Sequence, residues 1–210
     1  YGMTETSMNT SNPYFGERRL GTAGLPLPNV EVIVTDTATG QVLQEDRTGM
    51  IEIRGPNVFK GYWGMPEKTA EALRKNGFFI TGDLGKISED GYVSLIGRSN
   101  DLIISGGYNI YPKEIEMLLD RIDGVNESAV IGVPHPDLGE AVVAVIVNES
   151  GISLNRDSLL DSLQKRIARF KHPRHIMFVS ELPRNSMGKV QKNVLRESYK
   201  KIFSNETDTV

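Results

Sequence analysis

The pattern of hydrophobic and polar positions predicts a β-rich first half of the chain. Apolar, β-branched runs and alternating apolar and polar residues are typical of strands. Such patterns occupy residues 30–34, 49–54, 84–87 and 92–96. The last two flank a hairpin signal that ends in Gly91. One short helix is predicted from Pro66, a favoured first-turn residue, to Leu73.

The second half is predicted to mix helices and strands. After Pro112, apolar residues recur at helical spacing: Ile115, Leu118, Leu119 and Ile122. Further strands are predicted at 129–133, 141–147 and 176–179, and further helices at 157–170 and about 191–202. We therefore expect an α+β fold, with a small second domain beyond a polar stretch near 97–101 and a frayed end at 204–210.

Composition narrows the classes of function. The chain has 210 residues, enough for one large or two small domains, and a formal net charge of -3. That charge implies no general attraction to nucleic acid or anionic membranes. There is no cysteine, which excludes disulfides, a cysteine nucleophile and cysteine metal ligands. The three histidines are too scattered to suggest a zinc site.

From these residues we expect neither a membrane span nor a secretory signal. No apolar run approaches the ~20 residues that cross a bilayer, and no basic-then-apolar segment begins the chain. We expect a cytoplasmic protein, or a mitochondrial matrix protein in a eukaryote. Because the sequence opens on Tyr1 rather than Met, we also expect an upstream region of the same polypeptide.

Two short motifs in the first half could bind a nucleotide. In residues 1–5, Gly2 permits close backbone approach, Thr4 offers a hydroxyl, and Glu5 offers a carboxylate suited to Mg²⁺. Asp83, after Gly82, could bind ribose hydroxyls. Taken singly, each motif fits an ordinary structural turn equally well.

Two further segments offer cations on glycine-containing loops. Arg98 precedes the small residues Ser105-Gly106-Gly107, which suit a phosphate or sugar contact or, alternatively, tight packing at a domain junction. Lys189 lies on a loop before a helix, where a mobile loop could present its ammonium to an anion. A lone surface lysine is more often simply solvated, and the Walker spacing is absent.

In order, these segments resemble the core motifs of the adenylate-forming superfamily, which includes acyl-CoA synthetases, luciferases and peptide-synthetase adenylation domains. The similar segments are residues 1–5 (Y-G-x-T-E), 49–62, 79–84 (T-G-D), 97–116 (hinge) and 183–189 (terminal lysine). The resemblance implies that 1–97 ends a large AMP-binding domain, mostly β and partly a distorted barrel. It implies a hinge at 98–102 and a small, mobile α+β lid at 103–210.

The resemblance implies a role for each motif residue that binds ATP. Tyr1 would lie against adenine, beside Gly2, and Thr4 would contact the phosphates. Glu5 would ligate Mg²⁺. Asp83 would hold the ribose hydroxyls with help from Arg98, and Lys189 would bridge the acid carboxylate and the α-phosphate.

The resemblance also implies residues for a second, thioester-forming step. Ser105, Gly106 and Gly107 would line a channel for the pantetheine of coenzyme A. Lys171 is a candidate for its nucleotide phosphates, although the basic cluster around it fits a solvated helix face equally well. Asn100 occupies the hinge position, where the family usually has Asp or Lys.

The implied activity is an ATP-dependent acyl-CoA synthetase that uses a small carboxylic acid, ATP and coenzyme A. Residues 1–19 and 183–200 are more similar to malonyl-CoA and methylmalonyl-CoA synthetases than to fatty or aryl acid ligases. The arginine that those enzymes use for the distal carboxylate would lie upstream. The alternatives are another acid, loading of a carrier protein, or a non-catalytic fragment, and we expect this stretch alone to be inactive.

Overall fold

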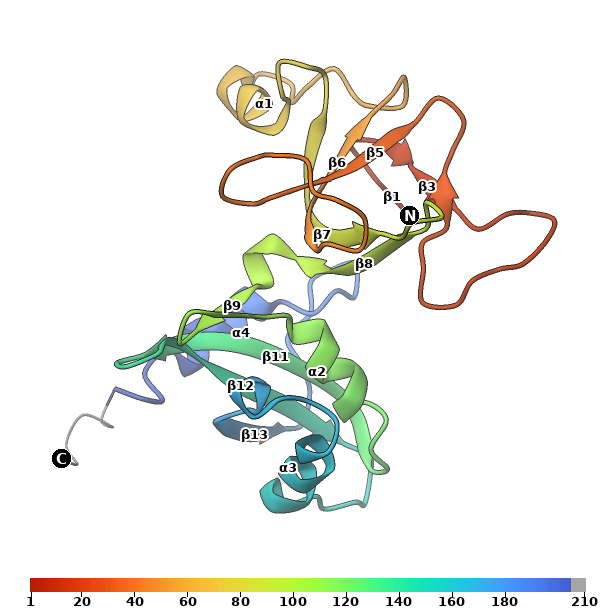
Figure 1. Ribbon diagram of the computed structural model, residues 1–210. Helices are drawn as coiled ribbons and strands as arrows, with labels where there is room; N and C mark the ends of the chain where they lie inside the picture. The colour runs from red at the N-terminus through yellow and green to blue at the C-terminus, as the bar shows by residue number, and fades with distance from the viewer. Residues whose placement is uncertain (205–210) are drawn as a thin grey trace. The chain divides into compact units, whose positions relative to one another are not determined.

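The computed structural model describes residues 1–204, and these form two compact units (Figure 1). The first unit is Tyr1–Asn100 and the second begins at Asp101. This division lies inside the stretch 98–102 that the sequence suggested as a hinge. The mixed α+β class is confirmed. Residues 205–210, part of the end that we expected to fray, lie outside the described range.

The first unit is built on an antiparallel sheet of four strands in the order β5-β6-β7-β8. These strands are β5 (Glu31–Thr35), β6 (Gly49–Arg54), β7 (Phe79–Ile87) and β8 (Val93–Arg98). Two small hairpin-like pairs precede them: β1 (Gly2–Met3) with β2 (Ser7–Met8), and β3 (Thr10–Ser11) with β4 (Leu25–Pro26). Helix α1 (Pro66–Ala72) connects β6 to β7. Within the described residues the sheet is open, with β5 and β8 at its edges, and does not close into a barrel.

The core of the first unit comes from the alternating residues that predicted its strands. Ile51 and Ile53 of β6 and Val93 of β8 are fully buried together. Because neighbours in a strand point to opposite faces, the alternation in 49–54 places these isoleucines on one face.

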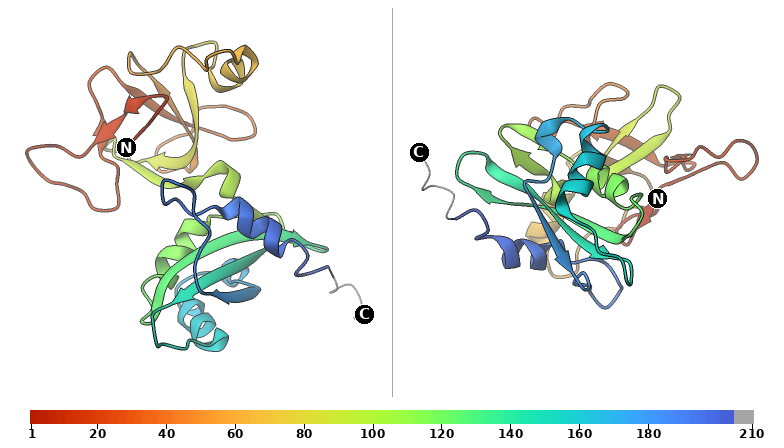
Figure 2. Two further views of the ribbon diagram at one scale, coloured as in Figure 1. Left: turned by 180° about the vertical axis from the view of Figure 1, so that it is seen from behind. Right: turned by 90° about the horizontal axis from the view of Figure 1, so that it is seen from below.

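The second unit is a five-stranded sheet covered by helices on both faces (Figure 2). Its strands run β10-β9-β12-β11, with β13 parallel to β12. They are β9 (Ile103–Ser105), β10 (Tyr108–Ile110), β11 (Val125–His135), β12 (Gly139–Asn148) and β13 (His175–Val179). Helices are α2 (Pro112–Leu119), α3 (Arg156–Gln164) and α4 (Lys192–Tyr199), with short 3₁₀ turns η1 (Ser99–Asp101), at the unit boundary, and η2 (Arg169–Lys171).

Strand β12 explains why residues 141–147 are apolar without interruption. Its Val142, Ala144 and Ile146 pack with α2 and α3, whereas the residues between them, such as Val143 and Val145, pack with α4. A central strand that is buried on both faces has no solvent side, so it does not alternate.

One prediction from the sequence needs correction, and one pair of strands was missed. The helix expected over 157–170 ends at Gln164, and the chain continues to the turn η2. Ile167 still packs against the same core as Leu163 of α3. The helical spacing of these two residues therefore reflects their burial and does not show that the helix continues to Ile167. The hairpin of β9 and β10 was not predicted. Its turn is Gly106-Gly107, with φ of 55° and 81°, which suits the two-residue turn that requires positive φ at both positions.

No helix within residues 1–204 has the length and apolar character that a membrane crossing requires.

Candidate functional site

In the first unit, three of the predicted site residues meet at one carboxylate. Strands β7 and β8 pair Asp83 directly with Arg98, and the Arg98 Nε lies 2.8 Å from Asp83 Oδ1. The Tyr1 hydroxyl donates to Asp83 Oδ2 at 2.5 Å. Burial, together with the hydrogen bond to Asp83, raises the pKa of Tyr1 above its usual range, so the phenol stays protonated and acts as a donor.

Thr81 supports this carboxylate and was missed as a site residue. Its hydroxyl donates to the Ile51 carbonyl at 2.8 Å and accepts from the Asp83 amide at 3.0 Å. Gly82 between them has a φ of 73°, which glycine adopts without strain. The T-G-D sequence therefore forms an irregularity within β7, where the pairing with β6 shifts register, and its hydrogen bonds orient Asp83. Only the structure shows that the threonine takes part in it.

Glu5 is held by contacts from residues 59–62. The Tyr62 hydroxyl donates to Glu5 Oε1 at 3.1 Å, and the Phe59 amide donates to the Glu5 carbonyl at 2.8 Å. Burial and this bond raise the pKa of Tyr62. Thr4 is exposed beside Glu5. Packing within the chain already explains the glycine at position 2, because a Cβ there would lie 2.2 Å from the Ser7 carbonyl oxygen.

Glu5 brings a single carboxylate to a candidate metal site. No group of three His, Asp or Glu side chains that could hold a metal is found in residues 1–204. Mg²⁺ is commonly held by one or two carboxylates together with substrate phosphates and water. The carboxylate of Glu5 and the neighbouring hydroxyl of Thr4 fit that kind of site, in which a nucleotide completes the shell.

In the second unit, Lys189 lies on a hairpin whose two sides are joined by hydrogen bonds. Asn185 Oδ1 accepts from the amides of Met187 at 3.0 Å and Lys189 at 2.9 Å. The Asn185 amide donates to the Lys189 carbonyl at 3.0 Å, and Gly188 has a φ of 78°. Lys189 itself is exposed, so the hairpin presents its ammonium to solvent.

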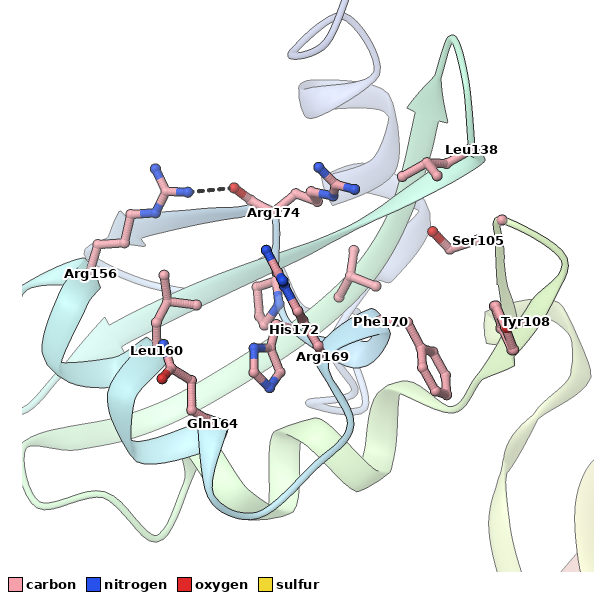
Figure 3. Close-up of a pocket in the computed structure, with 13 residues that line it drawn as sticks. Ser105, Tyr108, Leu138, Arg156, Leu160, Gln164, Arg169, Phe170, His172 and Arg174 are labelled. Carbon is pink, nitrogen blue, oxygen red and sulfur yellow. Dashed lines mark hydrogen bonds between the residues drawn. The ribbon is translucent and has the colours of Figure 1, made fainter.

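A groove of about 770 Å³ lies elsewhere on the second unit (Figure 3). Tyr108 and Phe170 stack at its side, with ring centroids 4.5 Å apart and an interplanar angle of 24°. Ser105 and Gly106 also line it. Three arginines contribute positive charge: Arg156, Arg169 and Arg174. Arg156 is oriented by a hydrogen bond from Nη2 to the Arg174 carbonyl at 2.7 Å.

Lys171 contributes differently from the prediction. Its Nζ lies 2.7 Å from both carboxylate oxygens of Glu114 on α2, and its side chain is about one-fifth exposed. It does not line the groove, although Arg169 and Phe170 beside it do. The arginines near Lys171, rather than Lys171 itself, bring positive charge to the groove.

Comparison with known proteins identifies both units. Residues 1–63 match the model of AMP-binding enzymes, and residues 114–189 match that of the AMP-binding enzyme C-terminal domain. A putative acyl-CoA ligase of Bacillus subtilis, YdaB, is 41% identical over 197 residues, which are 93% of this chain and 39% of the relative.

Solved structures agree with this match. The ATP-bound crystal structure of MatB from Rhodopseudomonas palustris superimposes with a TM-score of 0.92 at 59% identity, covering 97% of this chain and 40% of that one. The o-succinylbenzoate CoA synthetase MenE of Bacillus subtilis, in complex with its acyl-adenylate intermediate, gives a TM-score of 0.84 at 36% identity, over 93% of this chain and 40% of that one. The chain thus spans about two-fifths of the length of these relatives. It belongs to the adenylate-forming, AMP-binding enzyme family, and corresponds to the C-terminal portion of its members.

Proposed function

We propose that the chain is part of an ATP-dependent acyl-CoA synthetase, which forms an acyl-adenylate and then an acyl-CoA. The observation that carries the proposal is Lys189, an exposed ammonium on a closed hairpin in the unit that matches the AMP-binding C-terminal domain. A lysine presented in this way can act on an anionic reaction centre supplied by ATP and a carboxylic acid.

In the first step, a carboxylate oxygen of the acid attacks the α-phosphorus of ATP, a new C–O–P linkage forms, and pyrophosphate leaves. Negative charge gathers around phosphorus, and we assign Lys189 to stabilise it electrostatically. Tyr1, Gly2 and Asp83 would hold the adenosine, with Arg98 beside them. Each oxygen of Asp83 keeps a further lone pair, so ribose hydroxyls can donate to it although Tyr1 and Arg98 already do.

We assign Glu5 and Thr4 to the magnesium ion that accompanies ATP. When bound, the ion would neutralise phosphate charge. Within the protein, Tyr62 and Phe59 would keep the Glu5 carboxylate in place for it.

In the second step, the thiol of coenzyme A loses its proton to solvent and its sulfur attacks the acyl carbonyl carbon; the new C–S bond replaces the C–O bond to the phosphate, and AMP leaves. The groove of the second unit suits the nucleotide end of coenzyme A, because aromatic rings stack on a base and guanidinium groups bind phosphates. Ser105, Gly106 and Gly107 would border the pantetheine arm. Lys171 would support this surface through its pair with Glu114 rather than by binding phosphate.

We propose that residues 98–102, which include Asn100, are the hinge between an adenylating and a thioester-forming arrangement of the two units. The acid we propose is malonate or a related short dicarboxylic acid, because residues 1–19 and 183–200 resemble malonyl-CoA synthetases. Another acid or a carrier protein as acceptor remains the alternative. Since the chain spans about two-fifths of its relatives, we expect it to be inactive alone.

The test compares the two half-reactions in the full-length protein that contains this chain. Lys189→Ala should lower malonate-dependent ATP–pyrophosphate exchange by about 10²-fold or more, yet leave the conversion of pre-formed malonyl-adenylate by coenzyme A intact. Lys201→Ala, at another exposed lysine of the same unit, is the control. Equal loss of both half-reactions would contradict the role of Lys189. If the wild-type protein shows neither activity with any small acid, the function itself is wrong.

A further inference from the structure

Arg184 joins the hairpin that carries Lys189 to the sheet of the second unit through two contacts. Its Nη2 forms an ion pair with Glu127 of β11, and its Nη1 donates to the Gly188 carbonyl at 2.7 Å. Gly188 is the residue immediately before Lys189. A guanidinium has donors fixed in a planar fork, so one arginine can join two acceptors in a defined geometry.

The other hydrogen bonds of the hairpin are internal and set only its shape. The Gln191 amide donates to the Pro183 carbonyl at 2.7 Å, and the bonds of Asn185 lie between those two residues. Bonds of this kind would stay intact if the whole hairpin tilted against the sheet. They therefore do not determine where Lys189 stands relative to the rest of the second unit.

The base of the hairpin is anchored separately from its tip. Leu182 is buried in the core beneath α4, and Lys192 Nζ lies 2.5 Å from Glu116 Oε1 on α2. Val190, which follows Lys189, also packs against this core through its side chain. Among the hydrogen bonds and ion pairs of the described residues, Arg184 alone links the backbone next to Lys189 to a strand of the sheet.

We propose that Arg184, together with Glu127, is a positioning residue that sets the location of the Lys189 ammonium for adenylation. This inference rests on the function proposed above. Arg184 touches no substrate in this role and acts through Lys189. A misplacement of about 1 Å can lower a rate by about 10²-fold, so the contact controls the adenylation step.

The chain offers a closely matched control in the first unit. Arg54 also joins a carboxylate to a carbonyl: it pairs with Glu31 and donates to the Asn76 carbonyl at 3.2 Å. Its side chain is 43% exposed, against 44% for Arg184. Arg54→Gln therefore removes the same kind of contact at the same exposure, in the unit that does not carry Lys189.

In the full-length protein, Arg184→Gln and Glu127→Gln should each lower kcat for malonate-dependent ATP–pyrophosphate exchange by about 10- to 100-fold. The KM for ATP and the conversion of pre-formed malonyl-adenylate should stay within about twofold of wild type, and Arg54→Gln should change neither half-reaction. Exchange at the wild-type rate in Arg184→Gln, or an equal fall of both half-reactions, would overturn the proposal.

A charge swap separates the two contacts of Arg184. The pair Arg184→Glu and Glu127→Arg can re-form an ion pair, but a glutamate cannot donate to the Gly188 carbonyl. We expect the double variant to remain slow in exchange. Full recovery would overturn the two-point attachment.

A second measurement does not depend on catalysis. Residual dipolar couplings of the backbone amides of Met187 and Lys189, measured by NMR, should change in Arg184→Gln because the hairpin reorients against the sheet, while those of β11 and β12 amides keep their wild-type values. Unchanged couplings at the hairpin would overturn the proposal. If the wild-type protein activates no acid, the proposed function fails, and this measurement still decides whether Arg184 holds the hairpin.

Discussion

At the scale of the residue, the carboxylate of Asp83 organises the candidate nucleotide site. Tyr1 reaches it from the start of the chain, and Arg98 reaches it across the β7–β8 pairing. The motifs identified each of these residues separately. Their convergence depends on strand register, which places Asp83 opposite Arg98 and cannot be read from either motif alone.

Replacing Tyr1 by Phe tests this organisation. The variant keeps the ring and removes the donor to Asp83, so the carboxylate loses one of its two protein partners. A hydrogen bond of this kind contributes about 1 kcal/mol, so we expect the Kd of the full-length protein for ATP to rise about fivefold by calorimetric titration. Tyr14→Phe, at a tyrosine that is 81% exposed, should leave the Kd unchanged. An unaltered Kd in Tyr1→Phe would show that Asp83 does not need this partner.

At the scale of the element, α2 and α4 are joined by a buried ion pair. Glu116 of α2 pairs with Lys192 of α4, and the side chains are only 8% and 17% exposed. Glu116 also accepts from the Val130 amide of β11 at 2.9 Å. One carboxylate thus ties two helices and a strand together. The helical pattern predicted α2 and α4 but not this connection, because periodicity reports only which face of a helix is apolar.

Glu116→Gln should destabilise the second unit by about 3 kcal/mol, since it leaves the Lys192 ammonium buried without a counter-charge. Urea unfolding followed by hydrogen exchange of the second unit measures the change. Glu116→Gln combined with Lys192→Met should recover part of the loss, because the unpaired charge is removed as well. Glu197→Gln, which breaks an exposed pair with Lys200, should cost less than about 1 kcal/mol. A cost equally small for Glu116→Gln would refute the buried-pair account.

Helices and strands were predicted best where the spacing of apolar residues along the chain matches the period of the element that buries them. The strands at 30–34 and 49–54 and the helix from Pro112 correspond to β5, β6 and α2. The prediction failed after Gln164, where Ile167 packs on the core from a non-helical segment. It also missed β9 and β10, whose three residues each are too short to establish an alternation.

At the scale of the whole molecule, the two units have separate hydrophobic cores. Ile51, Ile53 and Val93 form one in the first unit, whereas the second unit packs a core on each face of its sheet. Separate cores allow the units to respond independently to a core substitution.

Ile131→Ala should therefore destabilise the second unit alone. Ile131 is fully buried in the core beside α4, so the substitution should cost about 2–5 kcal/mol. In the full-length protein at increasing urea, amides of the second unit should exchange at lower concentrations while those of the first unit keep their wild-type profile. Ile53→Ala, in the core of the first unit, should give the reverse. A joint shift of both profiles would show that the units unfold as one body.

The α+β class and most strands and helices follow from the sequence, and the motifs suggest Asp83, Arg98 and Lys189 as site residues, because burial periodicity and short motifs are local properties. The partners of the charged side chains are visible in the tertiary structure alone. Arg184 meets Glu127, and Lys171 meets Glu114 instead of the groove. Each of these pairs spans 57 positions along the chain. Such contacts follow from strand register and from helix packing on the sheet, and these arise from the packing of the whole unit rather than from local spacing.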